Sequence, residues 1–178
     1  MTICTHCAMC CDGTLFAHVG LDPAERARMA RLGQPVGERE GKPCLVHPCP
    51  ALAGTRCTVY PDRPGGCVQY RCELLKAVEA GATGVPQALD VIAEARAMAS
   101  EVTAALPPGE TPAWRTKLLG RPGEAPPPPV LAARLLRLNL FLDRHFRAPE
   151  KRVFRESPGN GGVDRPKEDV PSGAGGRV

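Results

Sequence analysis

The sequence predicts a small single-domain protein that is mainly α-helical, with an irregular, cysteine-rich N-terminal region. All nine cysteines lie within the first 72 of 178 residues, where proline and glycine recur too often for a long helix or strand to persist. After Cys72, apolar residues recur at helical spacing. Aromatic residues are few (four Phe, two Tyr and one Trp), so we expect metal coordination by the cysteines to organise the N-terminal region.

The N-terminal region contains two groups of cysteines separated by a short helix. The first group is CTHCAMCC, at residues 4–11. A helix is expected over residues 22–33, because Asp22 can cap it and Pro23 suits its first position. The second group spans residues 44–72, where turn-forming residues are so frequent that the side chains must hold the backbone in place.

Two helices are expected directly after the cysteines, over residues 71–81 and 85–106. The predicted apolar face of the second consists of Leu89, Ile92, Ala93, Ala99, Val102 and Leu106. We therefore assign residues 1–105 to one cysteine-cluster, metal-binding domain that includes its packing helices. Residues 106–129 are predicted to form a proline-rich linker with a short helical piece.

A further amphipathic helix is predicted over residues 130–147. Its apolar side consists of Leu131, Leu135, Leu138, Leu142 and Phe146. Its other sides carry Arg134, Arg137, Arg144 and Arg147. We expect this helix to dock onto the domain through the apolar side. Residues 157–178 combine glycine, proline and charge without periodicity, which predicts a disordered tail.

The first residues and the number of cysteines together predict the cellular compartment. The first residues form neither a basic leader nor an apolar stretch, and no segment approaches the ~20 apolar residues of a membrane helix. We therefore expect a cytoplasmic protein without a membrane partner. Thiols stay reduced in the cytoplasm, so a dense set of cysteines indicates metal binding or catalysis rather than a disulfide framework.

Charge is distributed unevenly along the chain. Residues 1–110 carry 10 Lys and Arg against 12 Asp and Glu, whereas residues 111–178 carry 13 against 7. A solvated, arginine-rich helix and tail explain the basic C-terminal part better than a nucleic-acid-binding surface does. The partner is unknown, and a protein bound through the basic helix at 130–147 stays open.

The first group has the chemistry of a metal site. Cys4, Cys7 and Cys10 form a C-x2-C-x2-C run, with which ferredoxin-type sequences hold an iron–sulfur cluster while a remaining ligand comes from elsewhere in the chain. Thiolates also suit zinc and cuprous copper. A zinc ribbon would show two separated C-x2-C pairs, and the second group contains none. The run therefore favours an iron–sulfur cluster, with zinc as the alternative.

The adjacent Cys10 and Cys11 point apart in any regular conformation. In a helix, at ~100° per residue, Cys11 would share a ~60° sector with Cys4 and Cys7 while Cys10 pointed ~100° away from Cys11. In a strand, neighbours face opposite sides. The pair therefore requires an irregular ligand loop or serves two centres, and a strained vicinal disulfide is a further alternative. Eight thiolates can fill two four-ligand sites, or one site beside reactive cysteines.

The two groups together resemble the YkgJ family, the CxxCxxCC cysteine-cluster proteins, which are described as zinc- or iron-chelating domains. The second group contains CTVYPDRPGGCVQYRC after an isolated Cys44. The positions that match the family pattern are Cys4, Cys7, Cys10, Cys11, Cys44, Cys57, Tyr60, Arg63, Pro64, Cys67, Tyr70 and Cys72. The resemblance covers residues 4–72 and implies that the eight matching cysteines bind metal.

Two departures from the family pattern bear on the ligand set. Cys49 is a ninth cysteine, and it stands with His47 in LVHPCPAL, where the family is usually more apolar. Either residue is a candidate additional or substitute ligand. Beside the ligands, the guanidinium of Arg63 could donate hydrogen bonds to sulfur and offset the charge of the cluster. Tyr60 is expected to pack against the cysteines.

The resulting expectation is a cytoplasmic YkgJ-type protein that binds an iron–sulfur cluster or zinc, with its biological role undefined. Whether it is an enzyme stays open, and its catalytic residues are unknown. One alternative is a cluster-dependent enzyme related to the flagellin lysine methylases, which contain a similar cysteine cluster. The other is a structural zinc module that presents its basic helix to a protein or nucleic-acid partner.

Overall fold

The computed structural model describes residues 3–154, so the tail predicted at 157–178 lies outside the described residues. The helices of this part are α1 (Cys4–Cys7), α2 (Pro23–Arg31), α3 (Gly65–Gln69), α4 (Glu73–Glu79), α5 (Val85–Thr103), α6 (Pro112–Leu118) and α7 (Pro129–His145), with 3-10 turns at Tyr60–Asp62 and Pro149–Lys151. The strands are β1 (His18–Gly20), β2 (Gly37–Arg39), β3 (Lys42–Val46), β4 (Leu52–Ala53) and β5 (Arg56–Cys57). The mainly α-helical fold with an irregular N-terminal region is thereby confirmed.

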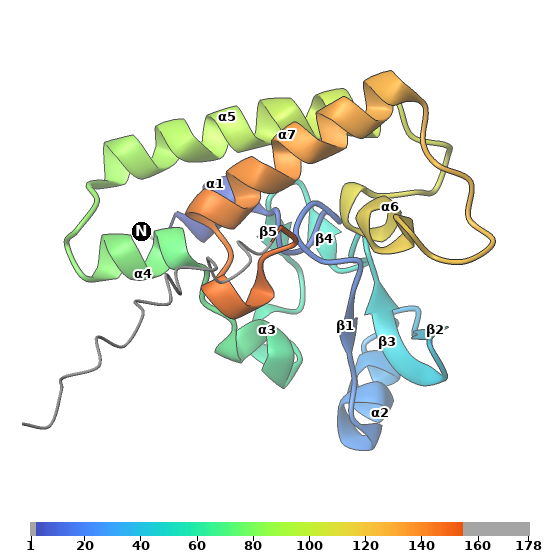
Figure 1. Ribbon diagram of the computed structural model, residues 1–178. Coiled ribbons are helices and arrows are strands. Elements are labelled where there is room, and N and C mark those ends of the chain that lie inside the picture. Colours follow the sequence, from blue (N-terminus) through green and yellow to red (C-terminus); the bar gives the residue numbers. More distant parts are fainter. Residues whose placement is uncertain (1–2, 155–178) are drawn as a thin grey trace, which may run out of the picture.

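The long helices α5 and α7 lie side by side at one end of the molecule and cover α1 and α4 (Figure 1). They enclose the helical core, which consists of Ile3, Cys7, Met9, Leu15, Leu74, Ala88, Ile92, Ala95, Met98, Ala99, Val102, Leu131, Leu135, Leu138, Leu142 and Phe146. All five apolar residues predicted for the inner side of α7 are buried there. On α5 the predicted face is displaced, since Ala93 is exposed while Ala95 and Met98 are buried.

Arg147 differs from its expected place on an outer side of the last helix. It is only 7% exposed, and its Nη1 lies 2.8 Å from Oδ1 of Asp143, which is also buried. The same nitrogen donates to the side-chain oxygen of Asn139 at 3.0 Å. Asp143 in turn accepts the backbone N–H groups of Val153 and Phe154. The arginine can be buried because a carboxylate four residues earlier on the same side of the chain neutralises it.

The segment predicted as a linker at 106–129 contains α6, which contacts three other parts of the molecule. The backbone N–H of Ala113 donates to the carbonyl of Gly13 at 2.9 Å. Asn139 of α7 donates to the hydroxyl of Thr116 at 2.9 Å. On the sheet side, the guanidinium carbon of Arg39 lies 4.4 Å from the ring centroid of Trp114. These contacts place α6 between the helical end and the three-stranded sheet.

The other end of the molecule is built on short elements and a small core. Strands β1, β3 and β2 form an antiparallel sheet in that order, and β4 pairs with β5. Helix α2 begins with a capping box, in which Asp22 and Glu25 each accept the other's backbone N–H, and it packs beside the sheet (Figure 1). The small core consists of Leu21, Met29, Leu45, Ala51 and Val59, with Val19, Val36, Cys49 and Cys57 packed against it.

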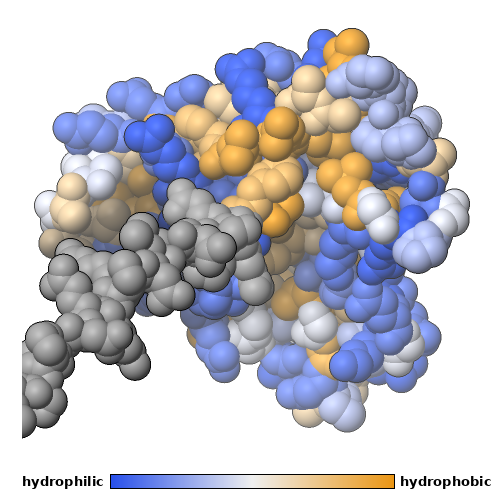
Figure 2. Space-filling model, viewed as in Figure 1, coloured by the Kyte–Doolittle hydropathy of each residue, from blue (hydrophilic) through white to orange (hydrophobic). Residues whose placement is uncertain are grey.

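Surface character also differs between the two ends. In the view of Figure 2, apolar side chains gather at the surface of the helical end, whereas the sheet end is largely hydrophilic. Within residues 3–154, none of the helices combines the length and apolar character that crossing a membrane requires.

Candidate metal centre

The structure gathers four of the predicted ligands beside the helical core. Cys4 and Cys7 belong to α1, Cys10 follows it, and Cys72 is the N-cap residue of α4. Cys7 is buried in the helical core, and Cys10 and Cys72 pack against it. Burial raises the pKa of Cys10 well above its usual value, and the charges of Cys7, Cys72, Cys11 and Cys4 raise it further. The charges of Cys72 and Cys4 also raise the pKa of Cys7. We call Cys4, Cys7, Cys10 and Cys72 the first cysteine set, and we group Cys11 separately because its carbonyl accepts the N–H of Cys49.

A second group of four cysteines gathers near the small core. Burial raises the pKa of Cys11 to about 12, and the charges of Cys49, Cys67 and Cys57 add to the increase. Burial also raises the pKa of Cys67 to about 11, and the charges of Cys49 and Cys57 add to the increase. The backbone also links the group, since the N–H of Cys49 donates to the carbonyl of Cys11 at 2.7 Å. We call Cys11, Cys49, Cys57 and Cys67 the second cysteine set.

The adjacent cysteines are divided between the two sets by the end of α1. Ala8 adopts a left-handed conformation with φ of 59° and terminates the helix. The chain then folds back, and the N–H groups of Cys11 and Asp12 donate to the carbonyl of Ala8. A continuous helix would place Cys11 with Cys4 and Cys7. The interruption instead brings Cys10 to that set and leaves Cys11 facing Cys49.

Cys44 is not brought to either set. It lies on β3, opposite Gly20 of β1 and Gly37 of β2. Its neighbour Leu45 faces the small core, and alternation along a strand directs Cys44 to the other side of the sheet. Burial raises the pKa of Cys44, and the charges that act on it come from Arg39, Glu38 and Lys117.

His47 is buried and engaged with the backbone. Its Nδ1 lies 2.8 Å from the carbonyl oxygen of Phe16 and donates to it in the matching tautomer. Burial lowers the pKa of His47, and the nearby charges are those of His18 and Asp12. This hydrogen bond fixes the ring and leaves Nε2 as the nitrogen through which His47 would act as an additional ligand.

Arg63 lies beside the second cysteine set. Its guanidinium carbon is 3.8 Å from the ring centroid of Tyr60, and its charge lowers the pKa of Cys67. The Nε–H of Arg63 is buried and has no hydrogen-bond partner among the described residues. Tyr60 itself is 54% exposed, so it supports Arg63 from outside rather than packing among the thiols. The ring of Tyr70 instead packs inside, edge-on against the ring of Phe16.

The sulfur atoms show features of metal ligands. Backbone N–H groups bond to three of the thiols: Met9 to Cys7, Ala51 to Cys49, and Leu75 to Cys72 with an N–S distance of 3.4 Å. Each contact favours the thiolate form that binds metal and lowers the pKa against the larger effect of burial. Soft thiolates held by backbone donors fit zinc and iron–sulfur clusters.

In the described part of the chain, the possible metal ligands are spaced too widely to hold a metal ion without rearrangement. Among residues 3–154, no three His, Cys, Asp or Glu side chains already lie close enough to share a metal ion. The four sulfurs of a set must therefore close around the metal, which is expected where ligand affinity and folding are coupled. The protonated thiols, with their raised pKa values, must also lose protons on binding.

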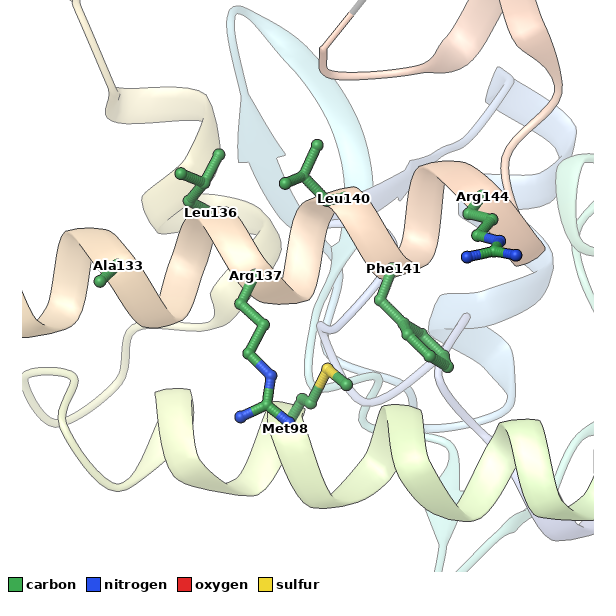
Figure 3. Close-up of a pocket in the computed structure, with 7 residues that line it drawn as sticks. All are labelled: Met98, Ala133, Leu136, Arg137, Leu140, Phe141 and Arg144. Atoms are coloured by element: carbon green, nitrogen blue, oxygen red, sulfur yellow. The ribbon is translucent and has the colours of Figure 1, made fainter.

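Surface hollows lie away from the two sets. One is a shallow groove of about 470 Å³ on α7, lined by Met98, Ala133, Leu136, Arg137, Leu140, Phe141 and Arg144 (Figure 3). In Figure 3, Leu136 and Leu140 point away from α5, whereas Arg137 and Phe141 reach toward it. A second hollow borders His47 and Pro48. Neither of these two hollows is lined by a cysteine.

Comparison with protein families supports a metal-chelating domain in this part of the chain. Residues 3–86 match the family model described as "CxxCxxCC: Putative zinc- or iron-chelating domain". The matched segment contains both cysteine sets and ends at the first turn of α5, so most of α5, α6 and α7 lie beyond it. Comparisons with curated proteins and with solved structures found no match.

Proposed function

We propose that this protein is a metal-binding protein that holds an iron–sulfur cluster through Cys4, Cys7, Cys10 and Cys72. The observation that carries the proposal is the composition of the first cysteine set. Three ligands come from one C-x2-C-x2-C run and the fourth comes from a remote position, which is the arrangement of ferredoxin-type cluster loops. Zinc, which four thiolates also hold, is the competing occupant.

The acidity of the thiols favours metal binding over thiol catalysis. A reactive cysteine needs a lowered pKa, because the thiolate is the nucleophile. Burial instead raises the pKa of Cys7 to about 12, and that of Cys72 is also raised. A metal cation at this position would replace the protons of the thiols and neutralise the charges of the thiolates. Without a cation, buried thiolate charges would be energetically costly.

The cysteines also support a reducing compartment, which we propose to be the cytoplasm. None of the nine forms a disulfide, although several lie close together. Reduced thiols are available for metal only where glutathione or thioredoxin keeps them so.

The test is anaerobic purification of the full-length protein, followed by iron, zinc and acid-labile sulfide analysis with an absorption spectrum. We expect iron, sulfide and visible charge-transfer bands. Cys4→Ser should remove them, and it should leave the fold intact because Cys4 is exposed. His6→Ala, in the same run and also exposed, is the matched control and should retain them. Colourless protein with stoichiometric zinc would show that zinc, and not an iron–sulfur cluster, occupies the site. Metal-free, folded protein would overturn the proposal.

A further inference from the structure

We propose a second, separate metal centre formed by Cys11, Cys49, Cys57 and Cys67, which takes a thiophilic cation such as Zn²⁺ and excludes Cys44. This inference rests on the proposed function, because it assumes that the clustered thiols bind metal. It departs from the ligand set that the sequence pattern implies, which contains Cys44 and not Cys49.

The position of Cys49 is fixed by two backbone hydrogen bonds. Its N–H donates to the carbonyl of Cys11 at 2.7 Å, and its carbonyl accepts from Leu52 at 2.9 Å. The second bond closes a turn that leads into β4, where Leu52 pairs with Cys57 of β5. Cys49 and Cys57 then both pack against the small core. One turn and one strand pair therefore link the backbone of three members of the second set.

The fourth member is delivered by α3. The N–H of Cys67 donates to the carbonyl of Pro64 at 2.9 Å in the first turn of this helix. Glu25 of α2 anchors the helix, because its Oε1 accepts the N–H of Gly65 at 2.6 Å. The anchored helix presents Cys67 to Cys49 and Cys57, whose charges act on it.

The separation of the two centres follows from what each set packs against. Cys10 lies against the helical core, whereas Cys49 and Cys57 lie against the small core. Cys10 and Cys11 are adjacent, but the turn at Ala8 directs one to each side. Each set contains four cysteines, which is the number that closes a tetrahedral zinc site or holds an iron–sulfur cluster.

The positive charge of Arg63 would offset the negative charge of a second metal centre. Four thiolates around Zn²⁺ carry a net charge of about −2, from formal charges of the ligands and the ion. The buried Nε–H of Arg63 lacks a partner in the described part of the chain, and its guanidinium lies near Cys67. A metal-bound sulfur at Cys67 would supply the acceptor that this donor lacks.

The experiment counts centres in the full-length chain and in four serine variants. Metal is removed with a chelator under anaerobic, reducing conditions, and Co²⁺ is titrated in while thiolate-to-cobalt absorption is followed. We expect two equivalents in the unmodified chain and in Cys44→Ser. Cys49→Ser and Cys11→Ser should each bind one equivalent, with the first set intact. Cys10→Ser should also bind one, at the second set.

The outcomes separate this inference from the proposed function. Two equivalents in Cys49→Ser with one in Cys44→Ser would overturn the exclusion of Cys44. One equivalent in the unmodified chain would overturn the second centre and leave the first. No thiolate-bound Co²⁺ at all would overturn the proposed function itself. Far-ultraviolet circular dichroism of each variant reports whether the helices have folded, and Cys11→Ser gives a second test of the same set where Cys49→Ser is unstable.

Discussion

The helical end and the sheet end of this molecule are stabilised in different ways. The helical end contains two long helices, α5 and α7, whose apolar faces meet in a contiguous core. The sheet end contains strands of two to five residues and a core of five buried side chains in the described chain. So small a core repays little of the conformational entropy lost on ordering the loops around it. The second cysteine set lies at this end, where bound metal would add the stability that the small apolar core lacks.

Polar groups at the two ends follow the same division. At the helical end, the buried Asp143 and Arg147 neutralise each other, and backbone N–H groups complete the hydrogen bonding of the carboxylate. At the sheet end, the Nε–H of Arg63 is buried without a partner among the described residues. The buried ion pair at the helical end is satisfied within the chain, whereas the Nε–H of Arg63 could donate to a metal-bound sulfur.

The largest expected effect comes from removing metal. Tetrathiolate binding of zinc in small domains supplies roughly 10 kcal/mol of apparent folding free energy. Chelation should therefore abolish amide protection over residues 37–67, while α5 and α7 keep most of theirs because aliphatic side chains make the contacts between these two helices. Hydrogen exchange with mass spectrometry on the full-length protein measures both regions together. Re-addition of metal should restore protection, and equal loss in α5 and α7 would contradict the division.

The second prediction perturbs the helical end alone. Leu138 is fully buried in the helical core, so Leu138→Ala should lower the free energy of unfolding by about 2–5 kcal/mol. Leu140 lies on the same helix but is 50% exposed, and Leu140→Ala should change stability by about 0.5 kcal/mol or less. Denaturant unfolding followed by circular dichroism compares the two. Co²⁺ binding by the second cysteine set should stay unchanged in both variants; its loss in folded Leu138→Ala would mean that the two ends are coupled.

The helical part of the fold was the more predictable from sequence. Leu131, Leu135 and Phe146 repeat at helical spacing, and burial of that face needed no knowledge of distant residues. The capped start of α2 was also readable from Asp22 and Pro23. Arg147 was misplaced because periodicity treats an arginine as solvent-facing and does not register a carboxylate one turn earlier. The domain boundary at residue 105 remains a prediction.

The cysteine-rich part was readable as chemistry but not as geometry. The sequence indicated which residues could bind metal, and the family match supports that class of site. It could not divide the thiols into sets, because the division depends on a left-handed Ala8 and on which side of β3 faces the small core. Alanine at positive φ has no sequence signature. The position of Cys44 likewise depends on strand register, which a five-residue strand in a turn-rich segment does not reveal.

The smallest expected effect concerns the unpartnered donor at the sheet end. Arg63→Gln removes a guanidinium that lies beside Cys67 and leaves the four thiols of the second set in place. The affinity of that set for Co²⁺ should fall about tenfold, equivalent to ~1.4 kcal/mol, because hydrogen bonds to ligand sulfurs tune metal affinity. Competition titration against a chelator of known affinity measures it, with the first set as internal reference.

Arg56→Gln is the control for that experiment, since Arg56 is exposed, precedes Cys57 and loses the same unit of charge. A purely electrostatic influence would weaken Co²⁺ binding similarly in both variants and would decline as salt is added. A directed hydrogen bond from Arg63 to sulfur would separate them, with Arg63→Gln weak at all salt concentrations and Arg56→Gln close to the unmodified chain. If Arg63→Gln weakened Co²⁺ binding by both sets equally, the two sets would form one shared metal centre. The helical end and the sheet end would then not differ in how they are stabilised.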